Sequence, residues 1–192
     1  FMKAFSSPSN CKNHKVLQVN GNSKLDISRL KNQKITDFKS WGKHFLICFK
    51  GFTVRIHLML FGTYRIDEAK ESTPRLSLKF NNGELNFYAC SVQFIEGDLN
   101  EAYNWQADVL SEQWNPRGAS KALKAIGNTL VCDALLDQSI FSGSGNIIKC
   151  EVLYRIKVHP QNKIKQLPPK KLAELVKQAR QYSFDFLKWK RN

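Results

Sequence analysis

The spacing of apolar residues changes near the middle of the chain, and this change constrains the fold more than any other feature. In the first half, a short apolar run at residues 44–49 is followed by Lys50-Gly51 and an alternating segment at residues 52–57, and residues 75–90 alternate on both sides of Asn81-Asn82-Gly83. Alternation on both sides of a short glycine-containing break is typical of antiparallel hairpins. Together with a further strand-like run at residues 16–19, these segments predict an antiparallel β-sandwich or flattened barrel.

In the second half, apolar residues recur every three or four positions, which is the helical period. Asn115-Pro116 predicts the start of a helix that runs to about Ile126, because asparagine caps helices and proline suits their first position. A short helix is expected at residues 129–136, with Thr129 or Asn128 as its cap.

Two further helices complete this half. One helix is expected from Asn146 to about Ile156, and Pro160 ends this element. A long helix is expected to begin at Leu167-Pro168-Pro169. The apolar stripe of the long helix reads as core: Leu172, Leu175, Val176, Ala179 and Tyr182.

The two patterns together predict an α+β chain of two domains. A β domain is expected over residues 1–100 and a helical domain over residues 101–192, with the boundary near Asp98 to Asn104. Neither internal repeats nor low-complexity segments interrupt this division.

The formal net charge of +14 points to an anionic partner. Each half carries 15 basic and 8 acidic residues, so the excess is not confined to a basic tail. Nucleic acid is the leading interpretation. A solvated basic face, a ribosomal partner and an anionic membrane surface remain open from charge alone.

Membrane insertion, secretion and metal binding find no support in the sequence. The longest apolar stretch, Ile56 to Gly62, is far short of a membrane span, and no secretory signal is recognisable. The five cysteines are odd in number and contain no C-x-x-C pair, so neither a disulfide frame nor a zinc knuckle is indicated. We expect an intracellular protein with free thiols and no cofactor in this chain.

The segment from Asp137 to Ile148 contains the clearest functional signal. Gly143 and Gly145 bracket Ser144, and Asn146 then opens a helix. Glycines let the backbone approach a ligand closely, and the free N–H groups of a helix N-terminus attract an anion such as phosphate. A plain tight turn between two helices is the alternative interpretation.

Extended to Pro160, this segment reads G-N-I-I-K-C-E-V-L-Y-R-I-K-V-H-P from Gly145. It resembles the helix–two-turn–helix of the formamidopyrimidine-DNA glycosylase and endonuclease VIII family. The resemblance implies that the turn amides at Gly143 and Gly145, together with Asn146, hold a DNA phosphate. It also implies that Glu151 supports the turn, and that the helical half is a helix–two-turn–helix domain.

Two matches in the first half extend the resemblance. Gly42-Lys43-His44-Phe45-Leu46 is similar to the family's strand carrying a phosphate-contacting lysine, which implies this role for Lys43. His57 to Ile66 resembles a loop that inserts an apolar wedge into DNA after a damaged base is extruded. The wedge falls on Met59, Leu60 and Phe61, with Leu60 preferred. Read without the resemblance, Lys43 is a solvated surface lysine and the three apolar residues are core at a strand end.

The chain departs from the family pattern at both ends. Family enzymes begin Pro-Glu, whose proline amine attacks the sugar, whereas this chain begins Phe1-Met2-Lys3-Ala4 and Pro8 is internal. The chain stops at Lys188 to Asn192, where a zinc or zincless hairpin module would follow. We therefore expect no catalytic residue and no zinc site in the chain as given, which would be inactive.

The resemblance favours one branch of the family and one function. Tyr88 to Phe94 lacks the D-P-R-R-F pattern of the 8-oxoguanine branch, which places the chain nearer endonuclease VIII. We expect a monomeric, nucleoid-associated, DNA-binding portion of a base-excision repair glycosylase and AP lyase. Its partner would be double-stranded DNA with a base lesion or abasic site. An inactive paralogue that binds damaged DNA and an RNA- or ribosome-binding protein are the alternatives.

Overall fold

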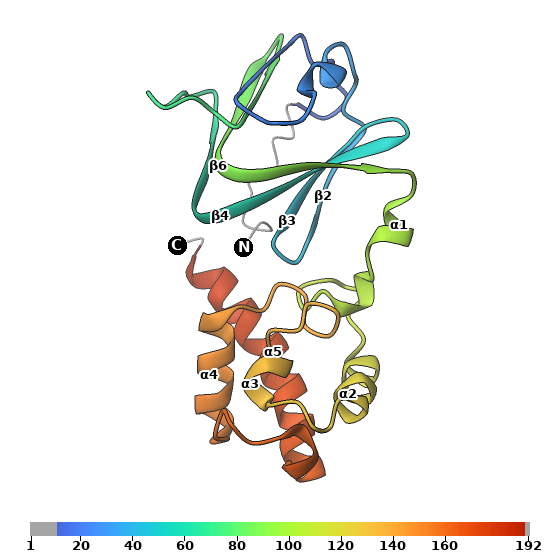
Figure 1. The fold of residues 1–192 in the computed structure, drawn as a ribbon, viewed down its shortest axis with the longest axis vertical. Helices are drawn as coiled ribbons and strands as arrows, with labels where there is room; N and C mark the ends of the chain where they lie inside the picture. Colours follow the sequence, from blue (N-terminus) through green and yellow to red (C-terminus); the bar gives the residue numbers. More distant parts are fainter. Residues whose placement is uncertain (1–10, 191–192) are drawn as a thin grey trace. The chain divides into compact units, whose positions relative to one another are not determined.

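The computed structural model describes residues 11–190, which form two compact units (Figure 1). The first unit extends to Ala102 and the second begins at Tyr103. The expectations about Phe1 to Ala4, Pro8 and the last two residues lie outside the described part of the chain.

The first unit is built on one antiparallel sheet with the strand order β1-β5-β6-β4-β3-β2. Its strands are β1 (Gln18–Asn20), β2 (Asp37–Trp41), β3 (His44–Cys48), β4 (Phe52–Ile66), β5 (Leu76–Phe80) and β6 (Gly83–Glu96). A 3-10 helix, η3 (Ile27–Leu30), follows β1, and the short helix α1 (Leu99–Ala102) ends the unit.

The long strands β4 and β6 connect the two halves of this sheet. One half pairs them with β3 and β2, and the other places β6 beside β5 and β1. The sheet folds over so that Phe45 on β3 meets Phe87 on β6, with ring centroids 6.0 Å apart. Leu78, Val54 and Ile56 are fully buried in the same core. A single folded sheet thus provides the flattened, two-layered packing expected from the alternation.

The second unit is helical. Its elements are η4 (Trp105–Ala107), α2 (Pro116–Ala125), α3 (Val131–Ala134), α4 (Asn146–Ile156), η5 (Ile164–Gln166) and α5 (Pro169–Trp189). Asn115 caps α2 as predicted, because its Oδ1 accepts the Gly118 amide at 2.9 Å. The predicted cap of α3 is wrong: Leu130 stands there, and the Val131 amide bonds the Asn162 carbonyl instead.

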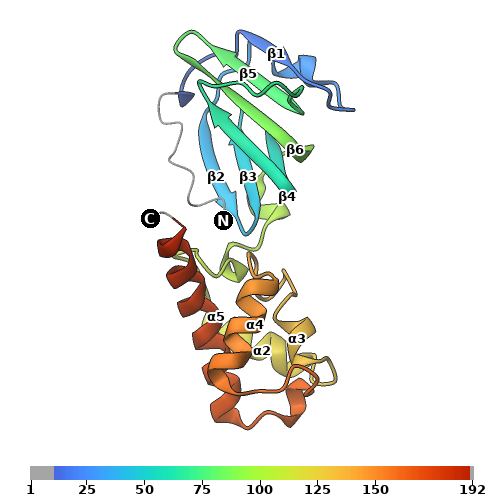
Figure 2. The same ribbon diagram turned by 90° about the vertical axis from the view of Figure 1, so that its left-hand side faces the viewer.

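Helices α4 and α5 pack side by side (Figure 2). All five residues of the predicted α5 stripe are buried. Arg155 on α4 pairs with Asp185 at 3.1 Å and lies 4.6 Å from the ring centroid of Tyr182. Helix α4 spans the predicted residues, but a left-handed Lys157 ends it before Pro160.

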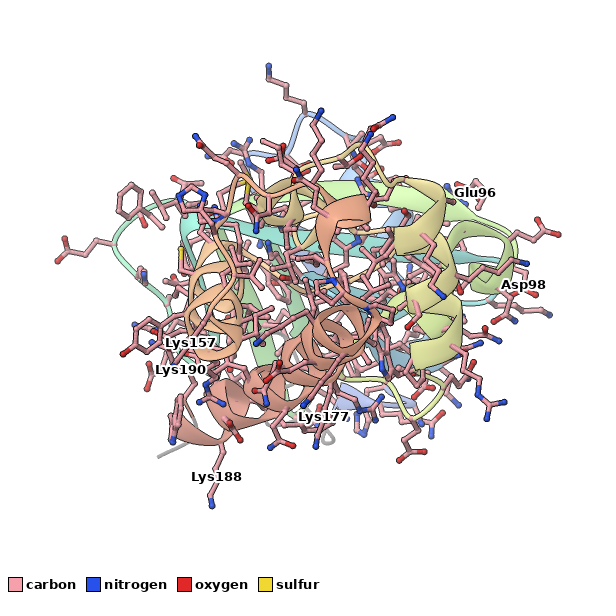
Figure 3. The ribbon with its side chains drawn as sticks, turned by 90° about the horizontal axis from the view of Figure 1, so that it is seen from below. Glu96, Asp98, Lys157, Lys177, Lys188 and Lys190 are labelled. Atoms are coloured by element: carbon pink, nitrogen blue, oxygen red, sulfur yellow. The ribbon has the colours of Figure 1, made fainter. Side chains whose placement is uncertain are left out.

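Lysines mark the surface of these helices. Seen from below, Lys157 lies at the end of α4, and Lys177 and Lys188 extend from α5 (Figure 3). None of the helices within residues 11–190 has the length and apolar composition needed to cross a bilayer. The sheet of the first unit and the helices of the second make the fold α+β, as predicted.

Candidate nucleic-acid interface

A bulge in β4 presents three apolar side chains to solvent. The pairing of β4 with β6 is interrupted between Leu58 and Thr63, whose partners Cys90 and Tyr88 are only two residues apart. Met59, Leu60 and Phe61 therefore have no partners in the ladder, and 58%, 89% and 83% of their surfaces are exposed. Such exposure excludes the interpretation that these residues are core at a strand end.

Gly62 closes the bulge by close backbone packing. A Cβ atom there would lie 2.7 Å from the Met59 nitrogen, 2.8 Å from the Ala89 oxygen and 2.9 Å from the Leu58 Cα. Ala89, the one residue of β6 opposite the bulge, adopts a positive φ of 47°. The backbone thus holds the extruded segment in place without help from its own apolar side chains.

Lys43 lies near the base of this bulge. It occupies the turn between β2 and β3, not the strand itself, and its side chain is exposed. His44 is paired with His57 in the antiparallel ladder, so Lys43 lies near Leu58, the residue that precedes the bulge. Desolvation nevertheless lowers the pKa of the Lys43 ammonium group.

Two histidines stand next to Lys43. The rings of His44 and His57 meet edge to face, with centroids 5.3 Å apart. Burial lowers the pKa of His44 to about 4, and the charge of Arg55 acts in the same direction. The pKa of His57 is lowered by desolvation and then by the charges of Lys43 and Arg55. At neutral pH the two histidines are therefore uncharged, and they stand beside the cations Lys43 and Arg55. This arrangement suits an anion.

The turn between α3 and α4 is organised by Gln138. Its Nε2 donates to the carbonyls of Leu136, at 2.8 Å, and Ser144, at 3.1 Å, while its Oε1 accepts the Gly143 amide at 3.1 Å. Gly143 adopts a φ of 95°, which favours glycine. Sequence reasoning gave Gln138 no role, because no local pattern reveals contacts that reach across a turn.

The start of α4 leaves backbone donors available. Gly145 precedes the helix in an extended conformation, and no side chain caps the first turn. The Lys149 ammonium lies 3.0 Å from the exposed Asn146 Oδ1 and adds a cation to the positive end of the helix. Lys149 was not predicted, although its position three residues after Asn146 is the spacing that brings helix side chains together. Backbone amides, a carboxamide and an ammonium therefore converge here, and they suit a phosphate.

Glu151 takes no direct part in holding the turn. Its side chain makes no hydrogen bond or ion pair with the residues that the structure describes, and the side-chain bonds to Gly143 and Ser144 come from Gln138. Its charge instead raises the pKa of Tyr182 on α5, although burial contributes more. Metal binding is also not indicated within residues 11–190, where no three potential His, Cys, Asp or Glu ligands are grouped.

Two family models match the chain, one in each unit. The formamidopyrimidine-DNA glycosylase N-terminal domain matches residues 8–93, which include the bulge. The formamidopyrimidine-DNA glycosylase H2TH domain matches residues 106–182, which include the Gln138 turn.

Similar proteins come from animals and bacteria. Mouse endonuclease 8-like 3 is 30% identical over 153 residues, covering 76% of this chain and 25% of that protein. Bovine endonuclease 8-like 2 is 35% identical over 153 residues, covering 71% and 44%. The chain thus spans less than half the length of either relative.

A solved structure shares the fold. The Lactococcus lactis Fpg in complex with abasic-site DNA superposes with a TM-score of 0.80 at 20% identity, covering 94% of this chain and 73% of that one.

Proposed function

Because the chain belongs to the formamidopyrimidine-DNA glycosylase and endonuclease VIII family, we propose that it is the damaged-DNA-binding part of a base-excision repair glycosylase and AP lyase. Its partner would be double-stranded DNA that carries a base lesion or an abasic site. The similarity to endonucleases 8-like 2 and 3 supports a place nearer the endonuclease VIII branch. Such a substrate implies an intracellular, nucleoid-associated location.

The exposed bulge is the observation that carries this proposal. Three large apolar side chains in water are costly for a protein unless they serve contact with a partner. Extruding a nucleotide from a duplex costs a few kcal/mol of lost stacking, and an apolar side chain can fill the vacated space. Leu60 is the most exposed of the three and is the proposed wedge.

The turn at residues 143–146 would hold the DNA backbone. The Gly143 amide already donates to Gln138, so the uncapped amides at the start of α4, together with Asn146 and Lys149, offer donors and positive charge to a phosphate. Such contacts do not depend on the base. Lys43, beside the bulge, would add a phosphate contact. Affinity for every duplex is then expected to fall steeply with salt, because each phosphate contact releases counterions.

Leu60→Ala tests the wedge by comparing an abasic duplex with an intact one. Loss of a Leu side chain from an apolar contact removes about 2 kcal/mol, so affinity for the abasic duplex should fall roughly thirtyfold. Affinity for the intact duplex should change little. Fluorescence anisotropy with labelled duplexes measures both values. Leu17→Ala, which removes an exposed leucine elsewhere in the same unit, is the matched control and should leave both affinities unchanged.

Asn146→Ala tests the turn in the same assay and should weaken intact and abasic duplexes alike. Equal losses on both duplexes for Leu60→Ala would remove the wedge assignment. Duplex RNA that competes as well as duplex DNA, with Leu60→Ala silent, would favour the RNA-binding alternative instead.

A further inference from the structure

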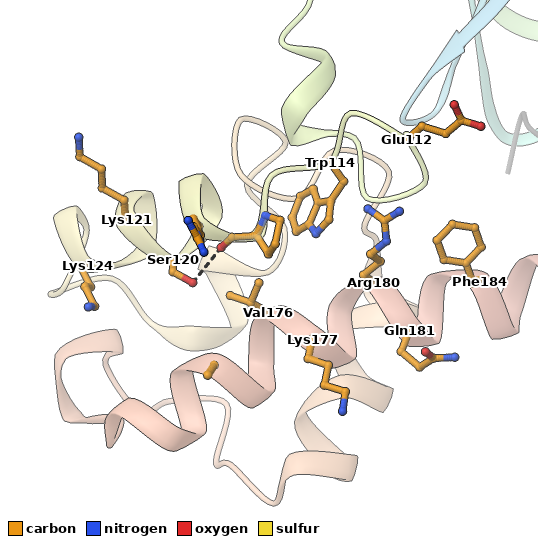
Figure 4. A pocket seen from close by; sticks show the side chains of 13 residues that line it. Glu112, Trp114, Ser120, Lys121, Lys124, Val176, Lys177, Arg180, Gln181 and Phe184 are labelled. Carbon is orange, nitrogen blue, oxygen red and sulfur yellow. Dashed lines mark hydrogen bonds between the residues drawn. The ribbon is translucent and has the colours of Figure 1, made fainter.

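A basic groove with an apolar floor runs between α2 and α5 in the helical unit (Figure 4). It has a volume of about 860 Å³, and none of its lining residues belongs to the Gln138 turn or to α4. Trp114 and Val176 lie between the two helices, with Lys121 and Lys124 on α2 and Lys177 and Arg180 on α5. The proposed contacts with damaged DNA use none of these residues.

The positive charge of this groove is uncompensated. Glu112 is the one acidic residue in its lining. Five basic residues line it: Arg117, Lys121, Lys124, Lys177 and Arg180. Among the residues that the structure describes, none of the five forms an ion pair or donates a side-chain hydrogen bond. Two other cations of the unit are paired, Arg155 with Asp185 and Lys171 with Glu174. Five like charges in one groove repel each other, so an anionic occupant would stabilise it.

The pattern of these residues is regular on both helices. Arg117, Lys121 and Lys124 follow one face of α2 at four- and three-residue spacing, and Lys177 and Arg180 do so on α5. The groove also exposes Pro116 at the start of α2 and, at the two ends of the cationic row on α5, Ala173 and Phe184. The site therefore offers cations on two helices together with exposed apolar side chains, a combination that matches an amphipathic ligand.

We infer that this groove binds an acidic amphipathic peptide segment of a partner protein. Apolar side chains of the peptide would contact Ala173 and Phe184, and its carboxylates would meet the lysines and arginines of both helices. From Ala173 to Phe184 the helix extends about 17 Å, which a helical segment of about twelve residues would span.

The groove suits nucleic acid less well. Proteins that bind single strands stack bases on open aromatic faces. Here Trp114 is buried, so of the two aromatic residues that line the groove only Phe184 is exposed, and no second ring is open for stacking. A sugar–phosphate backbone could meet the cations but would leave Pro116, Ala173 and Phe184 without a matching group. Charge and apolar surface together favour the peptide.

Binding of a synthetic peptide to the 192-residue chain tests the inference. The probe is a fluorescein-labelled peptide of about fourteen residues, with leucines at helical spacing among aspartates and glutamates. A second peptide of equal charge carries serines in place of the leucines, and labelled oligothymidylate serves as the nucleic-acid probe. Anisotropy at physiological salt should show the leucine peptide binding at least tenfold tighter than the serine peptide.

Charge reversal locates the site. The double variant Lys121→Glu and Lys124→Glu should weaken the leucine peptide at least tenfold, whereas Lys165→Glu with Lys170→Glu should change its affinity less than twofold. The control makes the same change in net charge, in the same unit, at exposed lysines outside the groove. Arg180→Gln, a milder change, should weaken binding severalfold and decides the matter if circular dichroism shows the double variant misfolded.

Three outcomes would overturn the inference. The first is equal affinity for the leucine and serine peptides, which would mean that the groove responds to charge alone. The second is equal sensitivity to the two double variants, which would place binding elsewhere. The third is tight oligothymidylate binding, sensitive to Lys121→Glu with Lys124→Glu, in the absence of peptide binding, which would assign the groove to nucleic acid.

Discussion

The bulge at residues 59–62 and the turn at residues 137–145 expose opposite parts of the polypeptide. In the bulge, the backbone packs tightly around Gly62 and the side chains of Met59, Leu60 and Phe61 point outward. In the turn, the Gln138 side chain bonds the backbone, and Ser142 and Ser144 are fully buried. The backbone amides at the start of α4 remain accessible.

Under the proposed function, this difference gives the two units different recognition tasks. Protruding apolar side chains distinguish a duplex with a vacant base position from an intact one, because only the vacancy accepts them without loss of stacking. Amides and a helix N-terminus contact phosphate, which every duplex presents. Variants of the bulge should therefore change selectivity, and variants of the turn should change affinity.

Gly62→Ala should produce the largest effect and would break the bulge. Its Cβ would meet three backbone atoms at 2.7–2.9 Å, none of which can move cheaply. We expect a loss of about 3 kcal/mol in the free energy of unfolding, together with lost selectivity for the abasic duplex. Urea denaturation and anisotropy measure the two quantities.

Gly127→Ala is the matched control for this substitution. There a Cβ would meet its nearest neighbour, the Lys165 Cβ, at 3.4 Å, which is ordinary contact. The control should cost less than about 0.5 kcal/mol. If both variants lose the same stability, close packing at Gly62 does not hold the bulge.

Gln138→Ala should produce the next largest effect and tests the turn. The change leaves the Gly143 amide and the carbonyls of Leu136 and Ser144 without their carboxamide partner. Partly buried groups that lose hydrogen bonds cost about 2 kcal/mol together. Affinity should fall by similar factors for intact and abasic duplexes, and Gln113→Ala, at an exposed glutamine, should change neither stability nor affinity. A selective loss on the abasic duplex would contradict the division of tasks.

The same contrast explains what the sequence could predict. Helix α4 was predicted from Asn146 to Ile156 because a glycine-rich break and helical periodicity are both local signals. The bulge was visible only through resemblance, since alternation is lost at Met59 to Gly62 while β4 continues to Ile66. Gly62 itself is fixed by contact with Ala89, 27 positions along the chain, which no local pattern records.

Strand β2 was not predicted, and the cap of α3 was predicted at the wrong residue, each for a physical reason. Strand β2 (Asp37–Trp41) is at the sheet edge and half exposed, so its polar residues show no apolar alternation. The cap of α3 was misplaced because a backbone bond from Val131 to Asn162 replaces the side-chain cap expected from Thr129 or Asn128. In both cases tertiary contacts override the local preference.

The smallest predicted effect is a pH dependence that arises at His44, beside the bulge. The pKa of His44 is about 4 in the folded protein against an ordinary value of 6.5. Between these values the unfolded chain binds a proton that the folded protein does not. The contribution of His44 to stability is therefore complete above pH 6.5 and is lost as the pH falls toward 4.

His44→Gln tests this dependence by removing the titrating group. Allowing for solvent screening of a partly exposed ring, wild type should lose about 1 kcal/mol more than the variant between pH 7 and pH 5. Urea unfolding at the two pH values measures the difference. Gln138→Ala removes no titrating group and should keep the wild-type dependence, although it is less stable at both values. Parallel curves for wild type and His44→Gln would mean that folding does not lower the pKa of His44, and the contrast with the turn would then lose its pH-dependent part.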